Sequence, residues 1–131
     1  MNRLVFIFVV FVVFFPTAAF AHYEGELLPD SVAVMEYSMI ISMNPKDTLI
    51  RNKLGMVYIR QNKPAKAREQ FIEILKVEPR NFDALDSLGL VCDREGKYKE
   101  ASEWYGKALK VKDDPGARKR YETALDKSKT R

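Results

Sequence analysis

The sequence predicts an all-α protein, a short right-handed α-solenoid of antiparallel helix pairs with a C-terminal capping helix. Residues 48–81 and 82–115 read as two copies of one 34-residue unit. Within each unit, apolar residues recur at helical spacing and helix-breaking residues separate the segments. No segment shows the apolar–polar alternation of a half-buried strand. A fixed period near this length is typical of a stacked helical array.

The two units share the residue types that closely packed helices need. The pairs 34 residues apart are Leu54-Gly55 and Leu88-Gly89, Ala67 and Ala101, Phe71 and Tyr105, Ile74-Leu75 and Ala108-Leu109, and Val77 and Val111. We expect the glycines and alanines to let the two helices of a unit approach closely, and the aromatic residues to fill the layer between units. The same phase continues backwards into residues 31–47, which predicts a half repeat there.

Capping and breaking residues divide this region into helices. Side chains that accept hydrogen bonds from backbone N–H groups begin helices, and proline either begins a helix or ends one. The predicted helices cover 31–43, 48–60, 64–77, 82–94, 98–111 and the segment after Asp114. Their starts carry, in order, Asp30 or Ser31, Asp47 or Thr48, Pro64, Asn81, and Asp114 with Pro115. Gly96 is expected to supply the positive φ of the turn before residue 98.

The motif content resembles the tetratricopeptide repeat (TPR) family. The matching residues are Leu54-Gly55, Tyr58, Ala67, Phe71 and Pro79, followed by Leu88-Gly89, Ala101, Tyr105 and Ala108. The chain departs from the family pattern at Arg51 and Leu85 (tryptophan in the family), Ile74 (alanine), Cys92 (aromatic) and Asp113 (proline). The resemblance implies a non-catalytic adaptor or assembly factor. The first helix of each repeat would line a concave groove that holds a peptide or helix of a partner protein.

The expected groove residues lie on the first helices of the two repeats. They are Asn52, Met56, Ile59 and Arg60, then Asp86, Leu90, Asp93 and Arg94, with Leu49 and Asp83 beside them. Arg60 and Arg94 occupy equivalent positions and could clamp a carboxylate or backbone carbonyls. Alternatively, they pair with nearby acids such as Asp93. Chaperone-binding members of the family hold a C-terminal carboxylate in a clamp of polar residues. We do not expect this clamp here, because the spacing of Asn52 and the two arginines does not match it.

We expect no enzymatic activity, no cofactor and no metal. His22 is the only histidine, so no Ser-His or Cys-His arrangement forms within one chain. Zinc sites need clusters of cysteine and histidine, which are absent from the sequence. Cys92 is the only cysteine, and its position on an inward-facing stretch predicts a buried, inert thiol. The alternative is an intermolecular disulfide or a redox role.

The first 21 residues are typical of a secretory signal. Arg3 precedes an apolar run at 4–15, and Ala19-Phe20-Ala21 ends the segment. The alternative is an uncleaved membrane anchor. We therefore expect a signal peptide at 1–21, a tether at 22–30, a half repeat at 31–47, repeats at 48–81 and 82–115, and a capping helix at 116–131. The protein would be periplasmic or secreted.

The charge is mildly positive and concentrated at the C-terminal end. The net charge is +4, and residues 107–131 contain nine Lys or Arg against four Asp or Glu. The last helix shows one apolar face with Ala117, Tyr121, Ala124 and Leu125, and the rest of it is charged, as a terminal cap requires. The simplest interpretation is a solvent-exposed helix without a binding role. The alternative is weak contact with anionic lipid or an acidic partner, and nucleic acid is not expected.

The helix at 31–43 is apolar on two sides. One side, with Ala33, Tyr37, Ile40 and Ile41, should pack on helix 48–60. The other side carries Val32, Met35, Met39 and Met43, which predicts an interface with a second chain. That chain is another copy, in a homodimer, or a partner helix, in a larger complex where the protein is a structural subunit. The alternative is that residues 22–29 fold back over this side.

Cleavage between Ala21 and His22 is the expected outcome of export, because the Ala-Phe-Ala sequence presents small residues where signal peptidase reads them. The intact mass of the exported protein measures it. A membrane-bound species that retains residues 1–21 would instead identify the apolar run as an anchor.

Overall fold

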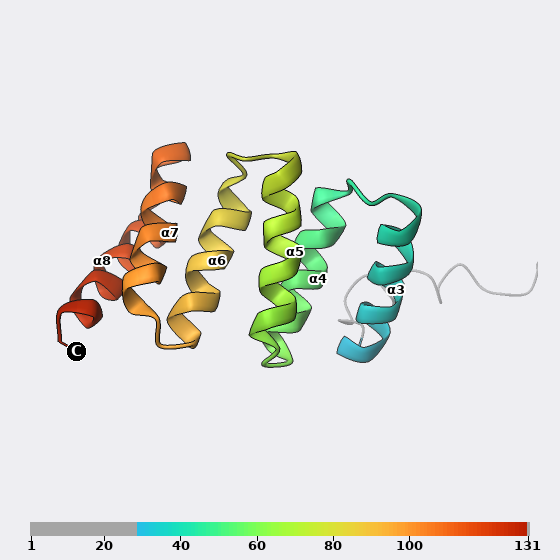
Figure 1. Cartoon of the computed structure of the whole chain (residues 1–131), viewed down its shortest axis with the longest axis horizontal. Helices are drawn as coiled ribbons and strands as arrows, with labels where there is room; N and C mark the ends of the chain where they lie inside the picture. The colour runs from blue at the N-terminus through green and yellow to red at the C-terminus, as the bar shows by residue number, and fades with distance from the viewer. Residues whose placement is uncertain (1–28, 131) are drawn as a thin grey trace, which may run out of the picture.

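The computed structural model describes residues 29–130, and within them it confirms the predicted all-α solenoid. Six helices follow one another, labelled as in Figure 1: α3 (Asp30–Met43), α4 (Thr48–Arg60), α5 (Pro64–Val77), α6 (Phe82–Arg94), α7 (Tyr98–Val111) and α8 (Pro115–Lys129). Consecutive helices run antiparallel and pack on one another, in a row from α3 to α8 (Figure 1).

Three of the helices begin at side-chain caps that the sequence predicted. Asp47 accepts a hydrogen bond from the N–H of Ile50 at 3.0 Å, and Asn81 and Asp114 do the same for the third residue after each. These caps satisfy backbone donors that have no partner inside the helix. Gly96 has the predicted positive φ, at 74°. Asn62, its counterpart in the preceding repeat, takes the same region at 54°.

The start of α3 differs from the prediction. Neither Asp30 nor Ser31 caps this helix: Asp30 is its first residue, and Pro29 precedes it without a side-chain hydrogen bond. The Asp30 carboxylate is instead held by Arg60, so it is not available to its own backbone. The helix therefore includes the last residue of the predicted tether.

The core joins each repeat to the next. One cluster contains Phe71 and Ile74 from α5 together with Ala84, Leu88 and Val91 from α6. A second cluster contains Cys92, Ala101, Tyr105 and Ala124, one or two residues from each of α6, α7 and α8. Because both clusters cross between helix pairs, the layers stack into one continuous interior.

Within each repeat, an aromatic ring lies directly on a glycine. Phe71 covers Gly55, and Tyr105 covers Gly89. Both rings are buried, so the space above each glycine is filled. The absence of a Cβ at these two positions sets how closely the two helices of a repeat pack.

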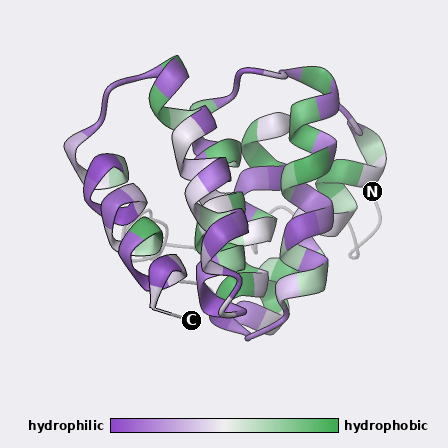
Figure 2. Ribbon diagram, turned by 60° about the vertical axis from the view of Figure 1, so that its left-hand side comes forward, coloured by the Kyte–Doolittle hydropathy of each residue, from purple (hydrophilic) through white to green (hydrophobic). Residues whose placement is uncertain are grey.

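The helix α8 ends the array with a polar surface. Its residues Lys119, Glu122, Thr123 and Asp126 stand 34 residues after Leu85, Leu88, Gly89 and Cys92, which are buried in α6. Ala117 and Ala124 are buried instead, and α8 packs against α7. Figure 2 shows α8 as a mainly hydrophilic helix. A further helix pair would find no apolar face on which to stack.

The predicted signal segment 1–21, His22 and most of the tether lie outside the described residues. Within residues 29–130, no helix has the combination of length and apolar character needed to cross a membrane.

Replacing either repeat glycine by alanine should lower the free energy of unfolding by about 1–3 kcal/mol, since overpacking strains a filled core. A Cβ at Gly55 would lie 2.6 Å from ring carbons of Phe71, and one at Gly89 would lie 2.5 Å from those of Tyr105. Urea unfolding followed by circular dichroism measures the change.

Gly106→Ala is the matched control on another helix. A Cβ there would lie 3.5 Å from the Tyr121 ring, which is ordinary contact. This change should be neutral or stabilise the protein by up to about 1 kcal/mol, the difference in helix propensity. Similar losses at all three glycines would show that the ring contacts do not set the spacing.

Candidate functional site

The helices α4, α6 and α8 are the first helices of successive units, and polar contacts tie them together side by side. Ser87 Oγ of α6 lies 4.0 Å from Met56 Sδ of α4. Arg120 Nη2 of α8 lies 2.7 Å from Asp86 Oδ2 of α6. We call this surface the first-helix face. It comprises Asn52, Met56, Asp86, Leu90, Asp93, Arg120 and Lys127.

Two ion pairs bridge α6 and α8 across one half of this face. Asp86 accepts hydrogen bonds from Arg120 Nε and Nη2 at 3.2 and 2.7 Å. Asp93 lies 3.4 Å from Lys127 Nζ. In each pair the partners are 34 residues apart, so they hold equivalent positions in consecutive units. Sequence reasoning missed Arg120 and Lys127 as part of the face. Extending the 34-residue register into the last helix would have found them.

The predicted arginine clamp is occupied by bonds within the protein. Arg60 donates to Asp30 Oδ1 from Nε and Nη2, at 3.0 and 2.7 Å. Arg94 donates from Nη1 to the carbonyl oxygen of Ile59 at 3.2 Å. The expected alternative partner of Arg94, Asp93, is bound to Lys127 instead. Each arginine therefore reaches back to the preceding unit and links the two.

Ile59 is a correction to the predicted groove set. Its side chain is 4% exposed and belongs to the core cluster that contains Phe71 and Val91. An apolar side chain at this position gains more from the layer between the repeats than from the surface. Its counterpart Asp93 is partly exposed and turns to Lys127. Leu49, which stands beside the groove set, is 64% exposed.

The half of the face between α4 and α6 is apolar and contains one unpaired acceptor. Met56 and Leu90 are partly buried and pack against the core from this side. Asn52 Oδ1 is buried, yet no described residue donates a hydrogen bond to it. Its equivalents in the next two units, Asp86 and Arg120, are bound to each other. A buried carbonyl oxygen without a donor costs about 1–3 kcal/mol, so this atom would gain from an N–H partner.

The hydroxyl group of Tyr105 is a second buried polar atom without a partner among the described residues. Burial, followed by the negative charges of Asp93 and Asp86, raises the pKa of Tyr105 above its usual value. The hydroxyl therefore stays protonated and keeps a hydrogen that it can donate.

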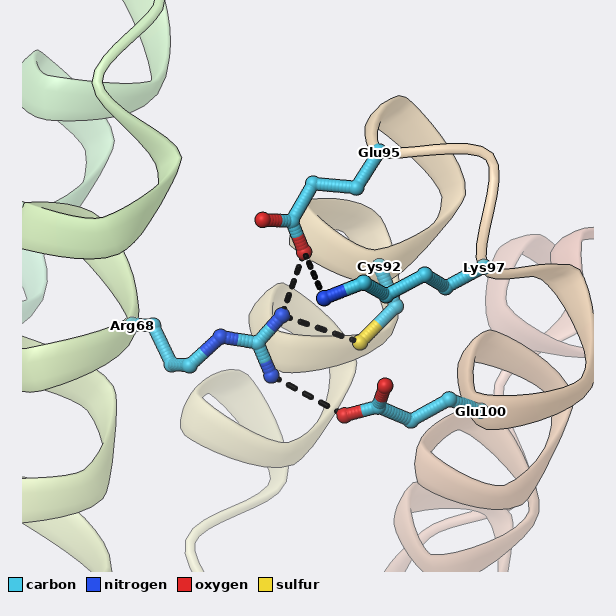
Figure 3. Close-up of polar contacts among 5 residues, drawn as sticks. All are labelled: Arg68, Cys92, Glu95, Lys97 and Glu100. Carbon is cyan, nitrogen blue, oxygen red and sulfur yellow. Dashed lines mark hydrogen bonds and ion pairs between the residues drawn. The ribbon is translucent and has the colours of Figure 1, made fainter.

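Arg68 links three helices on the other side of the repeats (Figure 3). From α5 it donates to Glu100 Oε1 of α7 at 3.0 Å, and Nη2 lies 3.6 Å from Cys92 Sγ of α6. It also pairs with Glu95, which Lys97 Nζ approaches at 3.5 Å. Burial opposes the charge of Glu100, but the hydrogen bonds from Arg68 and Cys92 and the positive charge of Arg68 together outweigh it, so the pKa of Glu100 lies below its usual value. This cluster joins the two repeats.

Cys92 has the character of an inert thiol. It is 0% exposed and forms no disulfide. Burial raises the pKa of the Cys92 thiol to about 11, although the positive charge of Arg68 acts in the opposite direction. At neutral pH the group is therefore protonated, and the thiolate that redox chemistry requires is scarce.

The exposed apolar side chains of α3 are those that the sequence singled out. Val32, Met35, Met39 and Met43 are 40%, 69%, 67% and 80% exposed, and we call them the methionine stripe. On the opposite side Ala33 is buried, Tyr37 and Ile40 are partly buried, and α3 packs on α4.

The remaining charged groups form no further cluster in the described part of the chain. Among residues 29–130, no group of three or more His, Cys, Asp or Glu side chains is placed to hold a metal ion. Most basic side chains of α8 bind acids: Arg118 pairs with Asp113, and Lys129 Nζ lies 3.8 Å from Asp126. Together with the pairs of Arg120 and Lys127, this fits a solvated cap.

The sequence profile of one family, described as tetratricopeptide repeat, matches residues 52–118, just over half of the chain. This segment begins inside α4 and ends inside α8, and it contains the repeat glycines and both α6–α8 acids. No curated protein sequence matches the chain.

Solved structures of the same architecture resemble the chain at low sequence identity. The first TPR domain of Spaghetti (RPAP3) bound to the HSP90 peptide SRMEEVD is 16% identical, with a TM-score of 0.71 over 74% of this chain and 78% of that one. The first TPR domain of human RPAP3 is 16% identical, with a TM-score of 0.73 over 77% and 80%. The Sgt2 TPR domain from Aspergillus fumigatus is 24% identical, with a TM-score of 0.71 over 86% and 73%.

A thiol reagent should label Cys92 slowly in the folded protein and rapidly in denaturant, because burial both blocks access and holds the pKa of the thiol at about 11. Mass spectrometry of a labelling time course measures both rates. Rapid labelling of the folded protein at neutral pH, or a dimer lost on reduction, would instead support a redox or cross-linking role.

Proposed function

The chain belongs to the tetratricopeptide repeat family, and from this premise we propose that it is a non-catalytic module that binds a peptide or helix of a partner protein on its first-helix face. The resemblance to a TPR domain bound to a peptide supports this class of function. We further propose that it acts outside the cytoplasm, as an adaptor or assembly factor. That part rests on the signal-like sequence of residues 1–21.

The single observation that carries the binding proposal is the unpaired oxygen of Asn52. An extended peptide presents backbone N–H groups at regular intervals. One of them would satisfy Asn52 Oδ1 once this partly exposed side chain turns outward. Met56 and Leu90 flank this position with partly exposed apolar surface. A polar anchor surrounded by apolar contacts is the usual composition of a binding site.

The charges of the face favour a ligand position between α4 and α6. Asp86 and Asp93 are neutralised by Arg120 and Lys127, so the α6–α8 half already has its partners. The α4–α6 half has no ion pair across it among the described residues, and it contains the unpaired acceptor. A ligand that binds there gains a hydrogen bond without first breaking one.

Asn52→Leu tests the proposal through two opposite effects. It should stabilise the free protein by roughly 1 kcal/mol, because it removes a buried acceptor that has no donor. It should also weaken the binding of a peptide selected on this protein from a displayed library, by about 1–2 kcal/mol. Thermal unfolding and isothermal titration measure the two effects.

Glu69→Leu is the matched control. Glu69 is exposed on α5, and a polar-to-leucine change there should alter both stability and affinity by less than about 0.5 kcal/mol. Leu90→Glu, which puts a charge into the apolar half of the face, should abolish binding of the same peptide. Selected peptides that bind all three variants equally well would place the binding site elsewhere.

A further inference from the structure

Three of the four positions in the methionine stripe carry charged residues in both full repeats, whereas the fourth, Met43, is equivalent to Val77 and Val111. The residues equivalent to Val32, Met35 and Met39 are Lys66, Glu69 and Glu73 in one repeat and Glu100, Glu103 and Lys107 in the next. In those repeats the surrounding helices are in place, and the positions still hold charges. Packing inside a repeat therefore does not require apolar side chains there. A contact outside the described helices must explain the stripe, because large apolar side chains in water forfeit the free energy of burial.

The two ends of the array differ in the polarity of their outward surfaces. A helical array stays soluble when its terminal surfaces are polar. The terminal helix α8 meets this condition with Lys119, Glu122 and Asp126. The other terminal helix of the described chain, α3, exposes Met35 and Met39 by about two-thirds each. Only the α3 end therefore gains from being covered.

The stripe has the shape of a helix–helix seam. Its members follow one another at intervals of three, four and four residues, close to the spacing along which two helices interdigitate. At 100° per residue, Glu36 borders the stripe on one side, and Ser42, Ser31 and Ser38 border it on the other. The apolar band is therefore about as wide as one partner helix.

We propose that two copies of the protein pair through their α3 helices, which lie antiparallel about a two-fold axis level with Tyr37. Met35 then faces Met39 of the second copy at two symmetric places, and Val32 lies beside its Met43. Such a contact uses the same surface on both copies, so the assembly is complete as a dimer and adds no further copies. The flexible methionine side chains adapt to each other across the seam.

A second copy fits the stripe better than the other occupants. Residues 22–29, which would precede α3 after cleavage, contain only Tyr23, Leu27 and Leu28 as large apolar residues. A membrane surface is disfavoured because α3 carries two acids, Asp30 and Glu36, and no base. A helix of another protein would leave the isolated chain monomeric, which the test detects.

Sedimentation equilibrium of the full chain as isolated tests the pairing. One helix seam is smaller than a standard interface, so the dimer should dissociate reversibly between about 1 and 200 μM. Met35→Glu combined with Met39→Glu should raise the dissociation constant at least about a hundredfold, because it buries four carboxylates per dimer. Circular dichroism should be unchanged, since both positions are exposed in the single chain.

Ala65→Glu combined with Thr123→Glu is the matched control. It adds the same charge at exposed positions of α5 and α8, away from the stripe, and the dimer should persist. A wild-type chain that stays monomeric over the whole range overturns the proposal. A dimer that survives the Met35 and Met39 changes also overturns it. Neither result depends on peptide binding at the first-helix face.

Cysteine cross-linking tests the antiparallel arrangement. Equal amounts of Met35→Cys and Met39→Cys chains, mixed under mild oxidation, should form a disulfide-linked dimer faster than either variant alone. The wild-type chain is the control for Cys92, which is buried and should stay reduced. Faster cross-linking of each variant with itself would indicate parallel helices and overturn the proposed symmetry.

Discussion

The contact on which the rest of the structure depends is an aromatic ring packed against a glycine. Phe71 on Gly55 and Tyr105 on Gly89 bring the two helices of each repeat to their packing distance. With that distance set, Ile74 and Leu88 meet between the repeats and the core becomes continuous. Buried interiors are close-packed, so the spacing inside one repeat is transmitted to the position of the next. The polar contacts between repeats form between side chains that this packing brings within reach.

Those polar contacts follow the repeat register and differ on the two sides of the array. On the first-helix face, equivalent residues of α6 and α8 bind each other, as Asp86 binds Arg120. On the other side, Arg68 spans from α5 to Glu95 and Glu100. Asn52 holds the same register position as Asp86 and Arg120 but has no donor among the described residues. At this register position the first-helix face is therefore bonded between α6 and α8, whereas its α4 member has no partner among the described residues.

The same register explains why the two ends of the array have different roles. An inner helix must be apolar toward both neighbours, and α6 is. The α8 helix keeps only the inward half of that pattern, with Ala117 and Ala124 buried, so the array ends there. The α3 helix packs inward through Ala33 and remains apolar outward through Met35 and Met39. The outward apolar surface of α3 would gain free energy on burial, whereas the polar outer surface of α8 would not.

The sequence by itself determined the helices, their caps at Asp47, Asn81 and Asp114, and the exposed stripe, because capping and helical periodicity are local. Only the tertiary structure decided the partners of the charged side chains and the burial of Ile59. Arg60 reaches Asp30, and Asp93 reaches Lys127 rather than its neighbour Arg94. Long side chains bind whichever group the packed helices bring within reach, and that depends on distances between helices that no single helix encodes.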